Sequence, residues 1–170
     1  MFKKNMRAPL VIASIVAFGF IGSTGSQAAT QTNNFDVTAT IIASCSISAG
    51  NLAFGNYDPL AVGDNDNTST IAVTCSNNAP YDIQLSTGLS GNLAARTMDD
   101  DLGNGDLLNY ALFYDAARTN NWGVTNGVDT YQGTGSGSNQ NITVYGRIAA
   151  GQTTPPIGDY TDTITATIEY

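Results

Sequence analysis

Two cysteines carry the clearest chemistry in this sequence. Cys45 and Cys75 are its only cysteines, and the chain opens with an export signal that is described below. An even number of cysteines in an exported protein favours a disulfide bond. Closing the loop between them would stabilise the fold by about 3–4 kcal/mol. A metal site would need further ligands, and no cluster beside either cysteine supplies them.

The sequence lacks the residue on which much hydrolytic and metal chemistry depends. It contains no histidine, which excludes a Ser-His-Asp triad, a Cys-His pair and a histidine-based metal site. The formal net charge is −8, from 14 acidic and 6 basic residues. Such a chain would be repelled by a phosphate backbone. We therefore expect no catalytic residues, no metal, no cofactor and no nucleic-acid partner.

Two acidic stretches remain as candidates for ion binding. They are residues 98–106, which include Asp99, Asp100 and Asp101, and residues 64–67. Oxygen ligands suit Ca²⁺, but neither stretch has the glycine and distal glutamate spacing of an EF-hand loop. Solvated loops are the simpler interpretation of both. A glycosidase would need a tuned pair of carboxylates, and nothing in the sequence indicates one.

One aromatic residue and two sequons are the remaining candidates for carbohydrate chemistry. Trp122 follows two asparagines and could stack on a sugar, although a packed loop residue is the simpler interpretation. The triplets at residues 67–69 and 141–143 match the glycosylation sequon, a short pattern that often arises by chance.

The first residues read as a secretory signal peptide. Lys3, Lys4 and Arg7 precede an apolar run over residues 8–21, and small residues at 26 and 28 fit a cleavage site after Ala28. The alternative is an uncleaved anchor, but the run is shorter than the roughly 20 residues that span a bilayer. No other long apolar stretch follows. We expect residues 1–28 to be removed and the remaining protein not to be an integral membrane protein.

The rest of the chain shows the two-residue alternation of half-buried β-strands. No helical periodicity is evident after Ala28, and breakers such as residues 56–59, 77–80 and 154–156 separate the runs. Residues 133–138 read as a flexible loop within a loop-like region between Arg118 and Asn139. Six or seven short strands indicate an all-β, immunoglobulin-like sandwich. The expected strands are residues 35–41, 70–75, 81–85, 107–114, 142–148 and 160–170.

The first and last of these runs suggest how the protein assembles. Residues 160–170 alternate up to the final residue, as if the sandwich lacked a closing strand. An incomplete sandwich exposes an apolar groove and an unpaired edge. The strand at residues 35–41 of a neighbouring molecule could fill that groove, which is donor-strand complementation, and the head-to-tail contact would propagate into a filament. Pairing of both strands within one monomer is the alternative, and the pattern alone leaves both open.

Five segments in order around the two cysteines resemble the spore coat protein U domain, a family that includes subunits of archaic chaperone–usher pili. The resemblance covers nearly all of the chain after the signal peptide, apart from the region between Arg118 and Asn139. The segments are Val37–Cys45, Leu52–Pro59, Val73–Cys75, Val144–Ile148 and Gly158–Ile164.

The resemblance implies an incomplete immunoglobulin-like sandwich over residues 43–170, completed by donor-strand complementation. The extension at residues 29–42 would be the donor strand, and the Cys45–Cys75 bridge would tie the first strand to the second. A periplasmic chaperone would occupy the groove first, and an outer-membrane usher would then exchange it for the next subunit's extension. The donor side chains would be Phe35, Val37, Ala39 and Ile41, and the edge of the groove would be Ile164, Ala166, Ile168 and Tyr170.

On this resemblance the protein would be exported through the periplasm into a surface pilus, or fimbrium, that serves adhesion and biofilm formation. With one domain and its own donor-like extension, it would be a shaft or adaptor subunit. One alternative is a structural protein of the spore coat. Another is a secreted monomeric carbohydrate-binding module, in which residues 29–42 would pair within the same chain.

Overall fold

The computed structural model describes residue 25 and residues 27–170. The basic residues and the apolar run of the predicted signal peptide lie outside these residues. The chain divides into two units, Met1–Ala39 and Thr40–Tyr170. In the described part of the first unit no residue belongs to a helix or strand, and every strand lies in the second. No helix in the described part of the chain is long and apolar enough to cross a membrane.

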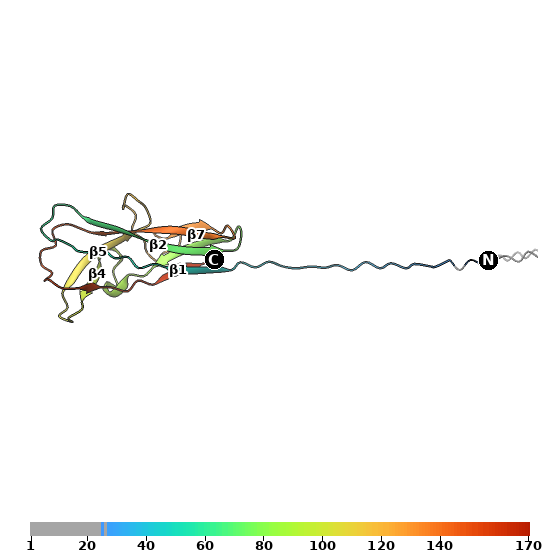
Figure 1. Ribbon diagram of the computed structural model, residues 1–170, viewed down its shortest axis with the longest axis horizontal. Helices are drawn as coiled ribbons and strands as arrows, with labels where there is room; N and C mark the ends of the chain where they lie inside the picture. Colours follow the sequence, from blue (N-terminus) through green and yellow to red (C-terminus); the bar gives the residue numbers. More distant parts are fainter. Residues whose placement is uncertain (1–24, 26) are drawn as a thin grey trace, which may run out of the picture. The chain divides into compact units, whose positions relative to one another are not determined.

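Within residues 27–170 nine strands form two antiparallel sheets (Figure 1). The larger sheet has the order β1-β2-β7-β5-β4-β8, and the smaller has the order β6-β3-β9. Two short 3₁₀ turns, η1 and η2, cover Gly88–Ser90 and Leu93–Ala95. The strands are β1 Cys45–Ala49, β2 Asn65–Cys75, β3 Pro80–Leu85, β4 Arg96–Asp100, β5 Leu107–Phe113, β6 Tyr131–Thr134, β7 Asn139–Ile148, β8 Tyr160–Thr161 and β9 Ala166–Glu169.

The core lies between the two sheets, because strands of both turn alternate apolar side chains inward. Trp122, between β5 and β6, is fully buried among them, and its indole Nε1 donates to the carbonyl of Ile83 at 2.7 Å. The all-β sandwich expected from the alternation is confirmed. Its buried residues include Ile71, Val73, Tyr81, Ile83, Leu85, Leu108, Tyr110, Leu112, Val144 and Ile148.

Several strand predictions need correction. Strands β4 and β6 were not expected, because their polar side chains hide the alternation, and β1 was expected only from the family resemblance, as the strand that Cys45 ties to the second. Residues 133 and 134 belong to β6, so the predicted flexible loop is wrong there, and β2 begins five residues earlier than predicted. Residues 35–41 form no strand, since no backbone partner pairs with them in the described chain.

The predicted strand over residues 160–170 is two strands, because this segment passes from one sheet to the other. β8 pairs with β4 in the larger sheet, and β9 pairs with β3 in the smaller one. The intervening residues 162–165 belong to neither sheet. The alternation of burial nevertheless continues through the crossing, from Tyr160 to Ile168.

Candidate functional site

An open groove, lined by more apolar than polar surface, lies beside the C-terminal segment. One wall is the segment that follows β1, which we call the strap and define as residues 50–57. The other wall is formed by residues 155–166. Two hollows of ≈ 490 and ≈ 650 Å³ make up the groove. They are adjacent, because both are lined by Leu52, Ala53, Phe54, Met98, Tyr160 and Thr161.

Core side chains form the floor of this groove. The smaller sheet has only three strands and ends at β9, so it leaves part of the larger sheet uncovered. Side chains that would otherwise be sealed between two sheets therefore line an opening. They include Ile71, Leu85, Leu108, Tyr110, Leu112, Val144 and Ile148.

Each wall adjoins an edge strand, because β1 precedes the strap and β9 begins where the other wall ends. β1 pairs only with β2, and β9 pairs only with β3 within the described residues. The two strands lie close together near the C-terminus of the chain (Figure 1), but no ladder of hydrogen bonds joins them. Each therefore keeps one row of backbone groups without a strand partner, which is the arrangement that accepts an added strand.

A polar contact fixes the C-terminal wall where it crosses between the sheets. The carboxylate of Asp162 accepts a hydrogen bond from the Tyr110 hydroxyl at 2.5 Å and from the backbone N–H of Leu89 at 2.9 Å. Gly88 lies so close to this carboxylate that a Cβ there would come within 2.0 Å of Asp162 Oδ2. Residue 88 must therefore lack a side chain for Asp162 to reach the 3₁₀ turn.

The four residues predicted for the edge of the groove fall into two groups. Ile164 and Ala166 line the smaller hollow. Ile168 is half-buried against the core, and Tyr170 is 60% exposed, and neither of them lines the hollows. The opposite wall was not predicted, although the alternation of Leu52 and Phe54 in the sequence indicates an apolar segment there.

The four side chains predicted for the donor strand are exposed and belong to no strand. Phe35 is 85% exposed, Val37 84% and Ile41 93%, and Ala39 is exposed as well. Large apolar side chains at alternate positions and in water are unfavourable unless a partner covers them.

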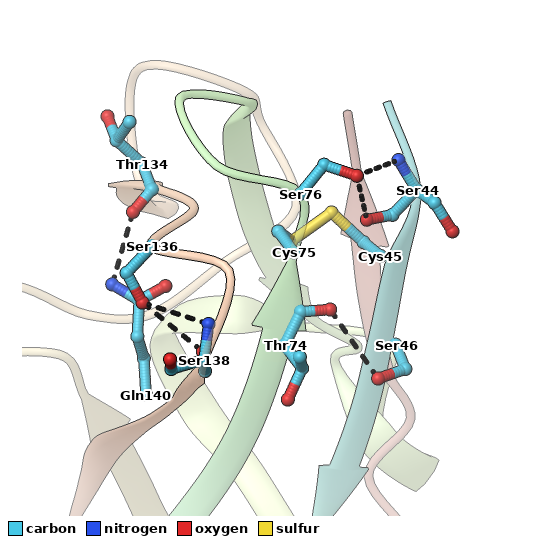
Figure 2. The surroundings of a disulfide bond; sticks show 10 residues. All are labelled: Ser44, Cys45, Ser46, Thr74, Cys75, Ser76, Thr134, Ser136, Ser138 and Gln140. Carbon is cyan, nitrogen blue, oxygen red and sulfur yellow. Dashed lines mark hydrogen bonds between the residues drawn. A yellow bond between two sulfur atoms is a disulfide. The ribbon is translucent and has the colours of Figure 1, made fainter. Parts of the chain in front are cut away.

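Two kinds of contact attach the start of β1 to the end of β2. Cys45 and Cys75 form a disulfide bond and pair directly in the β1–β2 register, which confirms the predicted bridge. Beside it, Ser44 N–H donates to Ser76 Oγ at 3.1 Å, and Ser76 N–H donates to the carbonyl of Ser44 at 2.9 Å. Figure 2 shows the bridge and the two serines side by side. The first residues of β1 are thus fixed to β2 by covalent and polar contacts.

The two acidic stretches have local structural partners. Asp100 is buried, not solvated as predicted, because its carboxylate accepts hydrogen bonds from Asn104 and Gly105 in the turn between β4 and β5. Asp66 on β2 accepts from Arg147 on β7 at 2.7 and 2.9 Å, and this contact holds the pKa of Asp66 below its usual value. No group of three or more histidine, cysteine or acidic side chains among the described residues is placed to hold a metal.

Comparison with known sequences decides the family. The Spore Coat Protein U domain matches residues 31–167. The chain belongs to the spore coat protein U domain family. Protein U of Myxococcus xanthus is 35% identical over 183 aligned positions, which cover 99% of this chain and 98% of that protein.

A solved structure from a pilus system is similar to this domain in fold. The domain matches a chain in the crystal structure of the CsuC–CsuE chaperone–tip adhesion subunit pre-assembly complex, from the archaic chaperone–usher Csu pili of Acinetobacter baumannii. The TM-score is 0.56 with 26% sequence identity, and the match covers 77% of this chain and 40% of that chain. The fold is therefore immunoglobulin-like, as predicted, and neither comparison describes an enzyme.

Proposed function

We propose that this protein is a structural, non-catalytic subunit of an extracellular chaperone–usher pilus that polymerises by donor-strand exchange. The observation that carries the proposal is a groove whose floor is made of core side chains and whose walls adjoin two sheet edges, each without a second strand partner among the described residues. An exported protein with such a groove would aggregate unless a specific strand filled it. Residues 43–170 would form the acceptor domain, once residues 1–28 have been removed on export.

The occupant that we propose is the extension, residues 29–42, of a second copy. Its alternate side chains Phe35, Val37, Ala39 and Ile41 are apolar, while the intervening ones are acidic or threonine. An added strand presents such a row to a groove and leaves the polar row in water. Each large apolar side chain that is buried contributes about 1.5–3 kcal/mol. Because the contact is head-to-tail, it continues from copy to copy.

The solved pilus complex supports a chaperone as a transient partner, and we propose an usher as the second. A periplasmic chaperone would cover the groove before assembly, along Ile164, Ala166, Ile168 and Tyr170, and an outer-membrane usher would exchange it for the extension. The finished fibre at the cell surface would serve adhesion and biofilm formation. Loss of surface attachment when the coding region is deleted would test this last role.

Matched substitutions on the two faces of the extension test the assembly. Phe35→Asp with Val37→Asp places charges in the apolar row, and Thr38→Asp with Thr40→Asp places the same charges in the polar row. With the chaperone and usher present, we expect a ladder on unheated denaturing gels and thin fibres by electron microscopy from the Thr38/Thr40 variant and not from the Phe35/Val37 variant. A stable wild-type monomer that needs no chaperone would contradict the proposal.

A spore coat subunit is the second candidate, favoured by the description of the family and by the likeness to Protein U. The same groove and extension would then assemble a coat instead of a fibre. Immunogold labelling distinguishes the two, since a coat protein would label spores and a pilin would label surface fibres. The monomeric alternative needs residues 29–42 paired within the chain, and residues 27–44 lie in no strand.

A further inference from the structure

The two walls of the groove are held in different ways. The wall near the C-terminus includes β8 and β9, whose backbones are paired with β4 and β3. In the strap the ladder of β1 stops, and the last backbone contact is the N–H of Gly50 to the carbonyl of Thr70 at 2.9 Å. Among the described residues no backbone–backbone hydrogen bond joins residues 51–57 to a strand.

Side chains of β2 hold the strap in place of a ladder. The amide of Asn65 donates to the carbonyls of Phe54 at 3.3 Å and Asn56 at 3.2 Å, and the amide of Asn67 donates to the carbonyl of Ala53. The hydroxyl of Ser69 donates to the carbonyl of Gly50 at 2.7 Å. Positions 65, 67 and 69 share one face of the strand, so they form a row of donors along the strap.

Apolar packing of the strap against the same sheet adds to these hydrogen bonds. The side chains of Leu52 and Phe54 lie over β7 at Gly146, where a Cβ would come within 2.8 Å of Leu52 Cδ1 and Phe54 Cζ. Because Gly146 has no side chain, Leu52 and Phe54 of the strap can pack directly against the backbone of β7. The strap is therefore held by these polar contacts and by the packing of Leu52 and Phe54 over Gly146. Phe54 also packs edge-on against Tyr110. At the end of the strap the Tyr57 hydroxyl donates to the carbonyl of Ala149 and accepts from the N–H of Gln152, both at 2.9 Å.

From these contacts we infer that Asn65, Asn67 and Ser69 are positioning residues. By holding the strap they set the width of the groove, and they thereby govern how fast a bound donor strand dissociates. The inference rests on the proposed function. It also explains the polar stretch at the start of β2. Asp66, between the two asparagines, pairs with Arg147 and Arg118, while the asparagines hold the strap.

The test measures release of a donor peptide from the full chain. The background carries Phe35→Asp and Val37→Asp, so that its own extension does not compete, and the probe is a fluorescent peptide of residues 29–42. Asn65→Asp and Asn67→Asp keep the shape of the amide and remove the donor. Asn141→Asp is the control, because Asn141 is exposed on β7 and its side chain makes no hydrogen bond to the described residues. Gly146→Ala displaces Leu52 and Phe54 of the strap and leaves the hydrogen-bond donors of β2 in place.

We expect Asn67→Asp to raise the peptide dissociation rate about fivefold to tenfold, as loss of one hydrogen bond would. Asn65→Asp removes two hydrogen bonds and should raise the rate at least as much, and Gly146→Ala should raise it as well. Hydrogen exchange should accelerate at Gly50 of the strap, whose N–H donates to the carbonyl of Thr70, and stay unchanged in the β2–β7 ladder, which a general loss of stability would not produce. Rates and exchange equal to those of Asn141→Asp would overturn the inference alone. A peptide that fails to bind the background protein would overturn the proposed function together with it.

Discussion

At the scale of single residues, buried polar groups organise the interior beside the groove. Arg96 is fully buried and donates to the backbone carbonyls of Leu85, Ser86 and Trp122. It therefore ties the end of β3 to the loop before β6. Burial lowers the pKa of Arg96, and the nearby carboxylate of Asp162 opposes that shift. The carboxylate of Asp162 in turn accepts a hydrogen bond from the Tyr110 hydroxyl. Arg96, Tyr110 and Asp162 therefore form a polar cluster beside the C-terminal wall of the groove.

Tyr110 makes the stability of the protein sensitive to alkaline pH. Burial raises the pKa of its phenol, and the hydrogen bond to Asp162 raises it further. In the unfolded chain the same phenol ionises at a pKa of about 10. The stabilisation is therefore complete below about pH 10 and is lost as the pH rises from there towards the folded pKa, because the unfolded chain releases the proton first.

We expect Tyr110→Phe to flatten this alkaline loss. Wild type should lose up to about 1.4 kcal/mol of unfolding free energy per pH unit through this group above pH 10, and the variant should lose correspondingly less. Denaturant unfolding between pH 8 and 11.5 measures both slopes. Tyr170→Phe is the control, since Tyr170 is exposed. Superimposable pH profiles for Tyr110→Phe and wild type would refute the assignment.

At the scale of elements, the short strand β1 depends on its covalent link. It is an edge strand of five residues, paired on one side only, and a strand of this length adds few contacts to a sheet. Its first residue carries the disulfide, and Ser44 beside it is bonded to Ser76. The bridge thus fixes the strand that leads into the strap.

Removal of the bridge should destabilise the domain and loosen β1. We expect Cys45→Ala with Cys75→Ala to lower the free energy of unfolding by about 3–4 kcal/mol, with faster hydrogen exchange in β1 than in β7. Ser46→Ala removes only the neighbouring contact from its hydroxyl to the carbonyl of Thr74 and should cost less than about 0.5 kcal/mol. Urea unfolding of the three proteins measures the difference, and a double variant as stable as wild type would count against this role.

At the scale of the whole molecule, one chain carries an open groove and a segment with the pattern of a strand to fill it. Intermolecular filling builds a polymer, whereas a copy of the segment attached in cis would fill the groove of its own domain. A linked segment acts at a high effective concentration, so the cis arrangement should prevail. This makes the proposed assembly testable without chaperone or usher.

We expect a chain with residues 29–42 moved behind Tyr170 through a flexible linker to be a monomer that does not form fibres. Because the segment would bind only the folded state, the unfolding temperature should exceed that of a chain from which residues 29–42 are simply deleted. The control carries Phe35→Asp and Val37→Asp in the moved copy and should unfold like the deletion. Equal unfolding temperatures for the intact and substituted fusions would argue against complementation. Light scattering and calorimetry provide the two measurements.

Where side chains alternate strongly, the sequence predicted the fold. Residues 81–85 and 107–113 alternate because one face of each strand is buried, and the same alternation persists through residues 160–168 across the change of sheet. In contrast, β1 contains Ser46 and Ser48, and β4 ends in Asp99 and Asp100. Such strands form because they pair with other strands, and the sequence of one segment does not show which strand that will be.

The sequence by itself determined the all-β class, the disulfide between its two cysteines and an alternating apolar row at residues 35–41, since these depend on residue type and local spacing. Only the tertiary structure decided where the groove lies. Its floor, its strap and the contact between Asp162 and Tyr110 join residues far apart in the chain. The reason is physical: burial of Asp100 or Trp122, and the seating of Phe54 over Gly146, arise from surfaces that exist only once the two sheets have packed.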